Sequence, residues 1–410
     1  MKNGFIKLPV LRRSGIFKLV VQMVNLCYNL SADRQGFKTS QNYHNFGLVA
    51  LVLLLIGCQP AEKPNTGKQP DTEAAQTEIR YARNFGITRT PDYKQIEVYQ
   101  PYPGSRDTLR YFLVNDKRTF TPPQSGLVIE VPLRRTLVFS APHFGFLDVL
   151  KQKNTVVGVS KKAYFASPYV QQEQVRELGE LSQASREVLL SLRPDATFLS
   201  AVSAEALDKS PRGVPAVFVS EWLENTPLGR TEWIKFFAAF YDQEDQATAW
   251  FDEVEAAYLQ LKARTDQQEP VSCFTGSPFK GTWYMARGDS YITNLLEDAG
   301  ARHLWDDQAG TGSLPLDLEV VYEKAKDADF WINANADSRQ VLQEQHPTFA
   351  AFRAFGKNNV LVNTNNEIED VNAYWTYGVT EPEVLLADLV SFFHPDLLPG
   401  HHPKYYQRLP

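Results

Sequence analysis

The chain has 410 residues, of which 43% are hydrophobic and 12% aromatic, enough for two domains with sizeable cores. Its formal net charge is −6, and because the first 57 residues hold seven Lys or Arg and one Asp, the part from Cys58 onward carries −12. A body this acidic argues against nucleic acid or anionic lipid surfaces as partners.

The N-terminal residues 1–57 are predicted to be a leader. Residues 46–57 form an apolar run of 12 residues, which suits a signal-peptide core and is too short to cross a membrane. The run ends in LIGC, which resembles a bacterial lipobox whose cysteine, here Cys58, is acylated and becomes the mature N-terminus. Residues 58–80 are polar and contain proline, so they predict a flexible linker. We therefore expect a protein of the cell envelope, lipid-anchored through Cys58 on a periplasmic or cell-surface face.

Residues 81–220 predict an N-terminal lobe. Its first part, 81–131, is rich in Tyr, Thr, Val and Ile between turn signals, which indicates antiparallel strands. Strand and helix patterns then alternate, as is typical of a largely parallel sheet flanked by helices. The predicted strands are 136–140, 155–160, 195–200 and 214–219, and the predicted helices are 146–151 and 185–192.

Residues 221–265 contain two amphipathic helical patterns in tandem. Apolar side chains recur at helical spacing, first at Trp233, Phe236, Phe237 and Phe240, and then at Ala247, Trp250, Phe251, Val254, Tyr258 and Leu261. We expect Asp242 to cap the second helix, and Lys262 and Arg264 suit its C-terminal end. Some 20 helical residues span roughly 30 Å, enough to connect two lobes. An ordinary surface helix is the alternative.

Residues 266–396 predict a second lobe built like the first. SREVLLSLRPDATFL at 185–199 matches DLEVVYEKAKDADFWI at 317–332, each with a helix start, a polar link and a buried strand. The predicted elements are strands 271–275, 329–333 and 359–363, and helices 290–299, ended by Gly300, and 317–326. The predicted fold is α/β, with two lobes that each have a mostly parallel central sheet flanked by helices, one long helix joining them and a ligand cleft between them. Residues 397–410 are expected to be a tail along the surface.

The sequence holds little sign of catalysis. Its seven histidines are scattered, and it has no H-E-x-x-H, paired C-x-x-C or G-x-S-x-G motif. Gly310–Ser313 lacks the preceding strand and the following lysine of a phosphate loop, so we interpret it as a turn. The chain is predicted not to be an enzyme and to need no cofactor, while a metal site at His143 and His303 stays open.

Binding has a clearer signature, because aromatic residues follow the predicted strands of both lobes, where open α/β sheets place their ligands. Aromatic walls with few polar groups suit a large, partly apolar, planar or chelating ligand. Burial in the core is the alternative for each residue, and Trp222 and Trp375 are the strongest candidates. The candidate ligand-binding residues are His143, Phe144, Tyr164, Phe165, Trp222, Phe279, Trp283, Arg287, Asn372 and Trp375.

Five motifs follow one another along residues 134–395. They are TLVFSAPHFGFLDVLKQKNTVVGVS and ELGELSQASREVLLSLRPDATFL in the first lobe, and YMARGDSYITNLLEDAGARHLW, LPLDLEVVYEKAKDADFWI and YWTYGVTEPEVLLADLVSFFHPDLLP in the second. In this order they resemble the class III periplasmic substrate-binding proteins of ABC importers, which bind ferric siderophores, haem or cobalamin. The resemblance implies a monomeric receptor for a small-molecule metal chelate, with an ABC permease and its ATPase as partners. It also implies one acidic docking residue in each lobe, for which Glu205 and Glu344 match.

The leading interpretation is a lipid-anchored receptor that delivers an iron chelate or a corrinoid to a permease. One alternative is a surface lipoprotein that binds a metal ion or haem through histidine ligation at His143. Another is an enzyme on the same scaffold, such as a chelatase, but such enzymes generally need several cysteines or histidines near the cleft.

Overall fold

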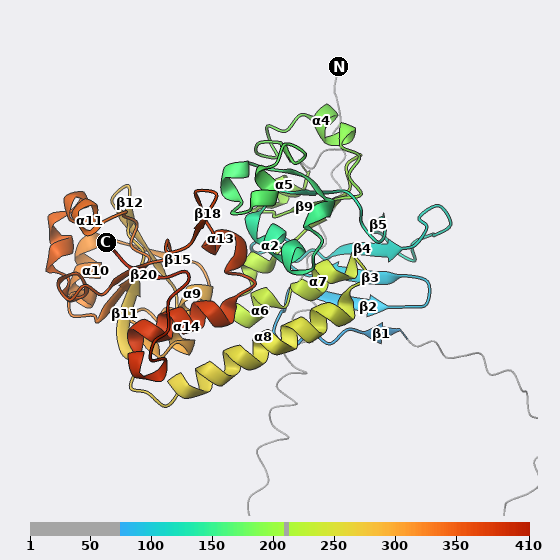
Figure 1. The fold of residues 1–410 in the computed structure, drawn as a ribbon. Coiled ribbons are helices and arrows are strands. Elements are labelled where there is room, and N and C mark those ends of the chain that lie inside the picture. The colour runs from blue at the N-terminus through green and yellow to red at the C-terminus, as the bar shows by residue number, and fades with distance from the viewer. Residues whose placement is uncertain (1–73, 209–212) are drawn as a thin grey trace, which may run out of the picture. The chain divides into compact units, whose positions relative to one another are not determined.

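The computed structural model describes residues 74–208 and 213–410. The predicted leader, Cys58 and residues 58–73 of the predicted linker lie outside the described residues. The described chain has two α/β lobes connected by the long helix α8 (Glu244–Thr265), drawn in yellow in Figure 1. The two-lobed fold predicted from the strand and helix alternation is confirmed. Within the described ranges, none of the helices is long and apolar enough to cross a membrane.

The described part begins with a five-stranded sheet, β1 to β5 in sequence order. The first three strand pairs are antiparallel as expected, but β4 and β5 are parallel, because residues 115–126 are long enough for the chain to cross back. One face packs on the connecting helices, with the Phe85 ring 4.7 Å from the Trp233 ring between centroids. The strands are β1 (Ala75–Gln76), β2 (Phe85–Arg89), β3 (Lys94–Val98), β4 (Leu109–Val114) and β5 (Leu127–Glu130).

The central sheet of the first lobe is parallel throughout, in the order β10-β9-β6-β7-β8. The direction of winding changes between β6 and β9, the kind of position where α/β sheets bind ligands at their carboxyl edge. The strands are β6 (Thr136–Val138), β7 (Val156–Val159), β8 (Arg176–Glu177), β9 (Ala196–Leu199) and β10 (Ala216–Phe218). The helices are α2 (Ala141–Val149), η1 (Lys153–Thr155), η2 (Lys162–Tyr164), α3 (Pro168–Gln171), α4 (Arg186–Ser191), α5 (Ala204–Asp208) and η3 (Glu221–Leu223).

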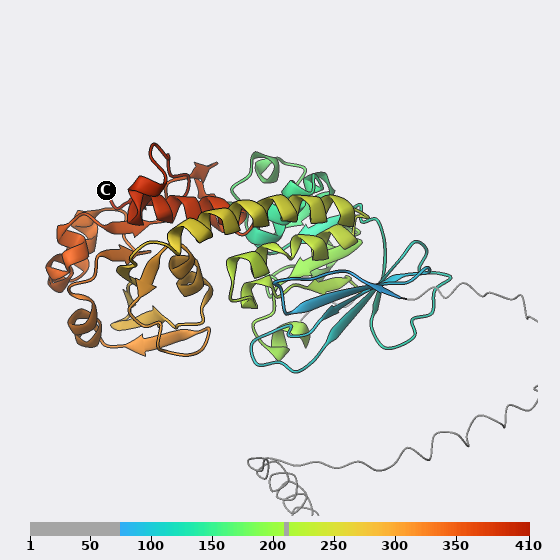
Figure 2. The same ribbon diagram turned by 90° about the horizontal axis from the view of Figure 1, so that it is seen from below.

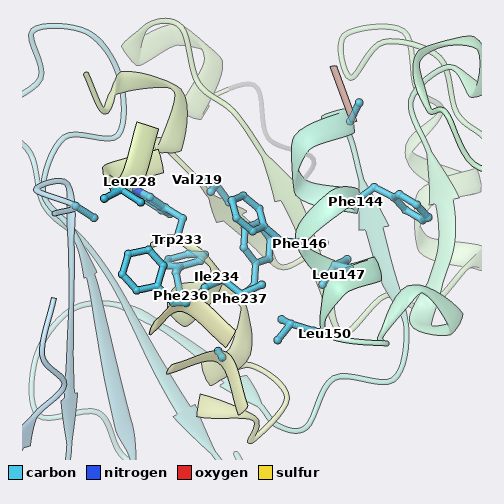
Figure 3. Packing of buried hydrophobic residues seen from close by; sticks show 14 of the residues in the cluster. Phe144, Phe146, Leu147, Leu150, Val219, Leu228, Trp233, Ile234, Phe236 and Phe237 are labelled. Carbon is cyan, nitrogen blue, oxygen red and sulfur yellow. The ribbon is translucent and has the colours of Figure 1, made fainter. Parts of the chain in front are cut away.

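Two short helices precede α8 and fill the core of the first lobe: α6 (Pro227–Thr231) and α7 (Ile234–Ala239). The first predicted aromatic stripe is fully buried here, and Figure 3 shows Trp233, Phe236 and Phe237 in this core. The Phe237 ring stacks on Phe146 of α2 with centroids 5.0 Å apart. Helix α8 then packs against α7 and, farther along, against α14 of the second lobe (Figure 2).

The expected capping of α8 by Asp242 is wrong. Asp242 has a left-handed backbone with φ of 56°, and Gln243 occupies the cap position without a side-chain hydrogen bond. The carboxylates of Asp242 and Glu244 instead form ion pairs with Lys94 of β3. At the other end, Lys262 and Arg264 lie in the last turn as predicted, where they favour the negative end of the helix dipole.

The second lobe has a central sheet in the order β14-β11-β16-β17-β20, parallel except for β20. The strands are β11 (Val271–Thr275), β12 (Pro278–Phe279), β13 (Thr282–Ala286), β14 (Ala301–His303), β15 (Ser313–Leu316), β16 (Phe330–Ile332), β17 (Val360–Val362), β18 (Glu367–Ile368), β19 (Val371–Asn372) and β20 (Gln407–Arg408). The helices are α9 (Tyr291–Asp298), α10 (Leu318–Ala325), α11 (Arg339–Gln345), η4 (Pro347–Ala351), α12 (Arg353–Gly356), α13 (Tyr374–Tyr377), α14 (Pro382–Phe393) and η5 (Pro395–Leu397).

The C-terminal residues belong to the second lobe and do not form the expected surface tail. Strand β20 pairs with β17, and Tyr405 and Tyr406 are fully buried. The cause is Asp388 of α14, a fully buried carboxylate that accepts hydrogen bonds from the backbone N–H groups of Lys404, Tyr405 and Tyr406. Backbone hydrogen bonds to one distant carboxylate require no periodic spacing of hydrophobic residues. The sequence of residues 397–410 therefore does not predict their burial.

The two lobes also contact each other directly through α2 and α13. The Thr376 hydroxyl of α13 accepts a hydrogen bond from Ala166 N at 3.1 Å. The Tyr377 hydroxyl donates to the Asp148 carboxylate at 3.0 Å. Gly145 of α2 packs so closely on the Thr376 carbonyl that a Cβ atom there would lie 2.2 Å from its oxygen. The lobes are therefore held together by specific contacts as well as by α8.

Glu383, in the first turn of α14, gives the fold a pH dependence. Its Oε2 is buried without a hydrogen-bond partner in the described chain, and burial raises the pKa of Glu383 from 4.5 to about 7. Because the folded pKa lies above the unfolded value, the resulting stability is present below about pH 4.5 and is lost as the pH rises through 7. Glu383→Gln should therefore stabilise the fold at pH 8 by about 2 kcal/mol and have little effect at pH 4.5.

Urea unfolding of the wild-type protein and of Glu383→Gln, each at pH 8 and pH 4.5, measures this difference in the free energy of unfolding. The exposed Glu253→Gln on α8 is the matched control and should leave the pH dependence of unfolding unchanged. A Glu383→Gln effect of equal size at both pH values would contradict the prediction.

Candidate binding cavity

A cavity of about 720 Å³ lies at the carboxyl ends of the parallel strands of the second lobe. Thr275 and Gly276 at the end of β11, Asn333 after β16 and Asn363 after β17 line it. This is the edge of an α/β sheet where neighbouring strands end together and their connecting loops leave room for a ligand.

The small antiparallel sheet of β12, β13 and β15 forms one wall. Side chains of β13 alternate, so that Tyr284 and Ala286 line the cavity while Trp283 and Met285 are fully buried in the core. Ser313 of β15 pairs with Ala286 and also lines the cavity. The Tyr284 side chain is 52% exposed, which leaves an aromatic surface for a ligand.

Helix α13 and the strand before it form a second wall. Trp375 lines the cavity with 61% of its side chain exposed, and its ring lies edge-on to Tyr374 at 5.0 Å between centroids. Asn372 holds this turn in place, because its Oδ1 accepts from Tyr374 N and its Nδ2 donates to Asn363 O, both at 3.0 Å. Both ends of the Asn372 amide therefore make hydrogen bonds that stabilise this wall of the cavity.

Beneath the cavity, a buried hydrogen-bond chain orients Thr275. His303 Nδ1 accepts from Trp305 N, so the ring proton lies on Nε2, which donates to the Thr275 hydroxyl at 3.3 Å. That hydroxyl contacts Met285 Sδ at 3.6 Å. Burial, together with nearby Lys324, lowers the pKa of His303 to about 4, so the ring is neutral at pH 7.

Residues before α8 contribute Pro142 and Arg230 to the lining. Arg230 lies in the last turn of α6, and its guanidinium contacts two backbone carbonyls and one ring. Nε donates to Glu224 O at 3.0 Å, and Nη2 donates to Trp222 O at 2.9 Å. The guanidinium carbon lies 3.9 Å from the centre of the Tyr291 ring, at the start of α9. Arg230 thus crosses from the first lobe to the second.

Of the predicted ligand-binding residues, Asn372 and Trp375 line this cavity. Phe144, Phe165 and Trp283 have no exposed surface and are core residues, with Phe144 and Phe165 packed edge to face. The remaining candidates are not among the lining residues of the cavity in the described chain: Tyr164 and Phe279 are exposed, Trp222 is partly buried, and Arg287 donates to Ala309 O.

His143 is also buried and does not face the cavity. Its Nε2 lies 3.2 Å from Glu221 Oε2 and 3.5 Å from Ser200 Oγ, at the carboxyl edge of the first-lobe sheet. No group of three or more His, Cys, Asp or Glu in residues 74–208 and 213–410 could hold a metal ion. The geometry therefore does not bring His143 and His303 together as ligands.

Sequence reasoning missed two parts of the lining. Arg230 falls in the segment that the sequence predicts to connect the lobes, three residues after the helix-initiating proline at 227. The glycine-rich segment read as a turn contributes Thr311, Gly312 and Ser313 to the cavity. Its position between two aromatic-rich segments was the available signal.

The model of the periplasmic binding protein family matches residues 140–366. The chain belongs to the class III periplasmic binding proteins. The matched range includes α8 and most strands of the two central sheets, whereas β6 and the sheet of β1 to β5 precede it and β20 follows it. Two relatives of this class III protein are uncharacterized lipoproteins of Methanocaldococcus jannaschii. One is 23% identical over 87% of this chain and 94% of its own length, and the other is 25% identical over 88% and 97%.

Solved structures share the fold of this class III protein at lower identity. A periplasmic heme binding protein from Pseudomonas aeruginosa matches with a TM-score of 0.53 and 18% identity, over 68% of this chain and 98% of that one. Helicobacter pylori CeuE with nickel bound matches with a TM-score of 0.51 and 14% identity, over 67% and 88%. Both likenesses concern the fold.

Proposed function

We propose that this periplasmic binding protein is the lipid-anchored receptor of an ABC importer for an iron–siderophore complex, or for haem or cobalamin. The observation that carries the proposal is the cavity, whose exposed Tyr284 and Trp375 form aromatic walls around a polar floor. Its volume of about 720 Å³ suits a small organic ligand, because ligand pockets typically measure roughly 300–1,000 Å³.

The chemistry of the lining favours a metal that arrives inside a chelate. Among the lining residues of the described chain there is no histidine or cysteine, two of the side chains that commonly ligate iron, nickel or zinc. A chelate presents its organic surface to the protein, and aromatic rings and amides recognise such a surface. Direct histidine ligation, the alternative at His143, lacks support because that ring is buried against Glu221.

The names of similar proteins support the same direction. The Pseudomonas aeruginosa protein is a heme binding protein, and the Methanocaldococcus jannaschii relatives are lipoproteins. Anchoring through Cys58 accords with the latter, although Cys58 lies outside the described residues. Glu205 on α5 and Glu344 on α11 are exposed, as permease docking requires, and we propose them for that role.

Tryptophan fluorescence should reveal the ligand class. We expect saturable quenching by one member of a panel of ferric siderophores, haem and cobalamin, because Trp375 borders the cavity. Trp375→Ala should weaken binding of that compound about tenfold, measured by equilibrium dialysis, since it removes an exposed aromatic anchor. Trp250→Phe on α8, remote from the lining, is the control and should bind normally. If no compound in the panel binds saturably, the proposed function is wrong.

A further inference from the structure

A second cavity of about 370 Å³ lies on the first lobe, at the edge of the central sheet opposite the carboxyl ends of its strands. We call it the amino-edge cavity. Neighbouring strands begin together there, because Thr136 at the start of β6 pairs with both Val156 of β7 and Ala196 of β9. Among the described residues, none lines both this cavity and the candidate binding cavity. The amino-edge cavity is therefore a separate site, which the proposed function does not use.

The lining of the amino-edge cavity has an apolar side and a polar side. The Val156 side chain is buried, and Val157, Leu192 and Tyr169 are partly buried. The Tyr169 hydroxyl donates to Val156 O at 3.3 Å, so this polar atom already has a partner. Such a lining suits a small molecule with an apolar part and a polar head. The exposed polar side chains that make up the rest of the lining are Arg135, Asn154 and Gln174.

Arg135 supplies a cation at the exposed side of the cavity. Its Nε donates to Leu192 O at 2.8 Å, and its backbone N–H donates to Asp195 Oδ2 at 2.9 Å, so both ends of the residue are held. Within residues 74–208 and 213–410, the Arg135 guanidinium forms no ion pair with a carboxylate. One of its five N–H donors is used, and the other four lie in a plane that matches carboxylate, sulfonate or phosphate oxygens.

More cations gather at this edge of the sheet. Lys151 follows α2 and Arg193 follows α4, each with a left-handed backbone between the helix and the next strand. Lys153 lies just before β7 and pairs with Asp148 at 2.9 Å. In the part of the chain that the structure describes, neither Lys151 nor Arg193 forms an ion pair. The amino-edge cavity therefore lies among several positive charges, of which only some are paired.

The carboxylates at this edge are fewer and have other partners. Asp195 Oδ2 accepts hydrogen bonds from the backbone N–H groups of Arg134 and Arg135 at 2.8 and 2.9 Å. Glu173 is exposed, where water and salt screen its charge. Because the chain from Cys58 onward carries −12, this excess of positive charge is a local departure from an acidic protein, and it favours an anion.

We propose that the amino-edge cavity binds a small organic anion, whose carboxylate, sulfonate or phosphate group contacts Arg135 and whose apolar chain lies on Val157 and Leu192. This inference does not rest on the proposed function. Both parts of the ligand contribute, because the guanidinium binds the head group and the partly buried side chains cover the chain. A neutral molecule of the same length lacks the charge-assisted hydrogen bond, and a short anion lacks the apolar contact.

Isothermal titration calorimetry with four probes tests the proposal. The protein is the full chain with Cys58→Ser, which lacks the predicted acylation site, so that no detergent competes with the probes. We expect octanoate or octyl phosphate to bind saturably. Octanol, which lacks the charge, and acetate, which lacks the chain, should bind at least about tenfold more weakly. Arg135→Gln should weaken binding of the anion about 10- to 100-fold, the range for a charge-assisted hydrogen bond.

Further variants separate recognition from folding and from binding elsewhere. Arg135→Lys keeps the charge without the planar donors and should bind the anion with intermediate affinity. Arg118→Gln removes an exposed arginine that is not among the described lining residues and should leave the affinity unchanged. Absence of saturable binding by both anions, or equal binding by the wild-type protein and Arg135→Gln, would overturn the inference. Loss of binding in Trp375→Ala but not in Arg135→Gln would also overturn it, because the anion would then occupy the candidate binding cavity.

Discussion

Glu232→Ala will lower the free energy of unfolding by about 3–5 kcal/mol, one of the two largest effects that we expect from a single substitution. Glu232 is fully buried between α6 and α7. Its carboxylate accepts hydrogen bonds from the backbone N–H groups of Arg80, Tyr81 and Ala82 at 2.7–3.0 Å, and from Lys235 Nζ at 2.8 Å. Alanine would leave three backbone donors, of which Ala82 N is buried, and the buried Lys235 ammonium without this acceptor.

Urea unfolding followed by circular dichroism measures the loss. Limited proteolysis should also cleave near Arg80 faster in the variant, because that segment is attached through this carboxylate. Adding Lys235→Met to Glu232→Ala should restore part of the stability, since it removes the unpaired buried charge. Glu253→Ala, at an exposed site on α8, should change stability by less than about 0.5 kcal/mol. A loss below about 1 kcal/mol for Glu232→Ala would refute the importance of this carboxylate.

Gly145→Ala will destabilise the contact between the lobes, with an expected loss of about 2–3 kcal/mol. The added Cβ would lie 2.2 Å from the Thr376 carbonyl oxygen, a backbone atom of α13 that cannot move without its helix. In a helix, alanine is normally more stable than glycine by up to about 1 kcal/mol. A lower stability of Gly145→Ala would therefore come from the contact with α13 and not from helix propensity. Trp375 directly precedes Thr376 in α13, so displacement of this helix should also weaken ligand binding about tenfold or more.

The matched control is Gly356→Ala at the end of α12, where a Cβ atom meets nothing within 4 Å. Thermal unfolding and ligand titration of both variants give the two readouts. Gly356→Ala should retain full binding and unfold at a similar or higher temperature. Unchanged binding and stability in Gly145→Ala would show that α2 and α13 are not tightly coupled.

Hydrophobic period and helix-end signals predicted most of the elements that build the lobes. The strand expected at 271–275 is β11, and the helix expected at 290–299 is α9, with Ser290 as its cap and Gly300 at a left-handed φ of 81°. These signals are local, because each depends on neighbours within one or two turns of the chain. The alternation of strands and helices then allowed few arrangements other than parallel sheets.

The cavity lining was harder to predict, because exposure depends on what packs against a residue. Phe144 and Trp375 are both aromatic residues in segments that follow strands, yet Phe144 is fully buried against Phe165 and Trp375 is 61% exposed. The same holds for His143, whose polar partners Glu221 and Ser200 are distant in sequence. Nothing in the neighbouring residues distinguishes a ring that packs inward from one that faces a ligand.

The sequence by itself determined the fold class, the two lobes and the long connecting helix, since these follow from the local period and order of elements. Only the tertiary structure decided where β20 pairs, that Asp388 holds the C-terminal residues, and that Arg230 reaches the cavity beside Tyr291. The physical reason is that these features rest on polar contacts between distant segments. Each such contact depends on a single side chain, so it produces no repeating pattern of residues from which it could be predicted.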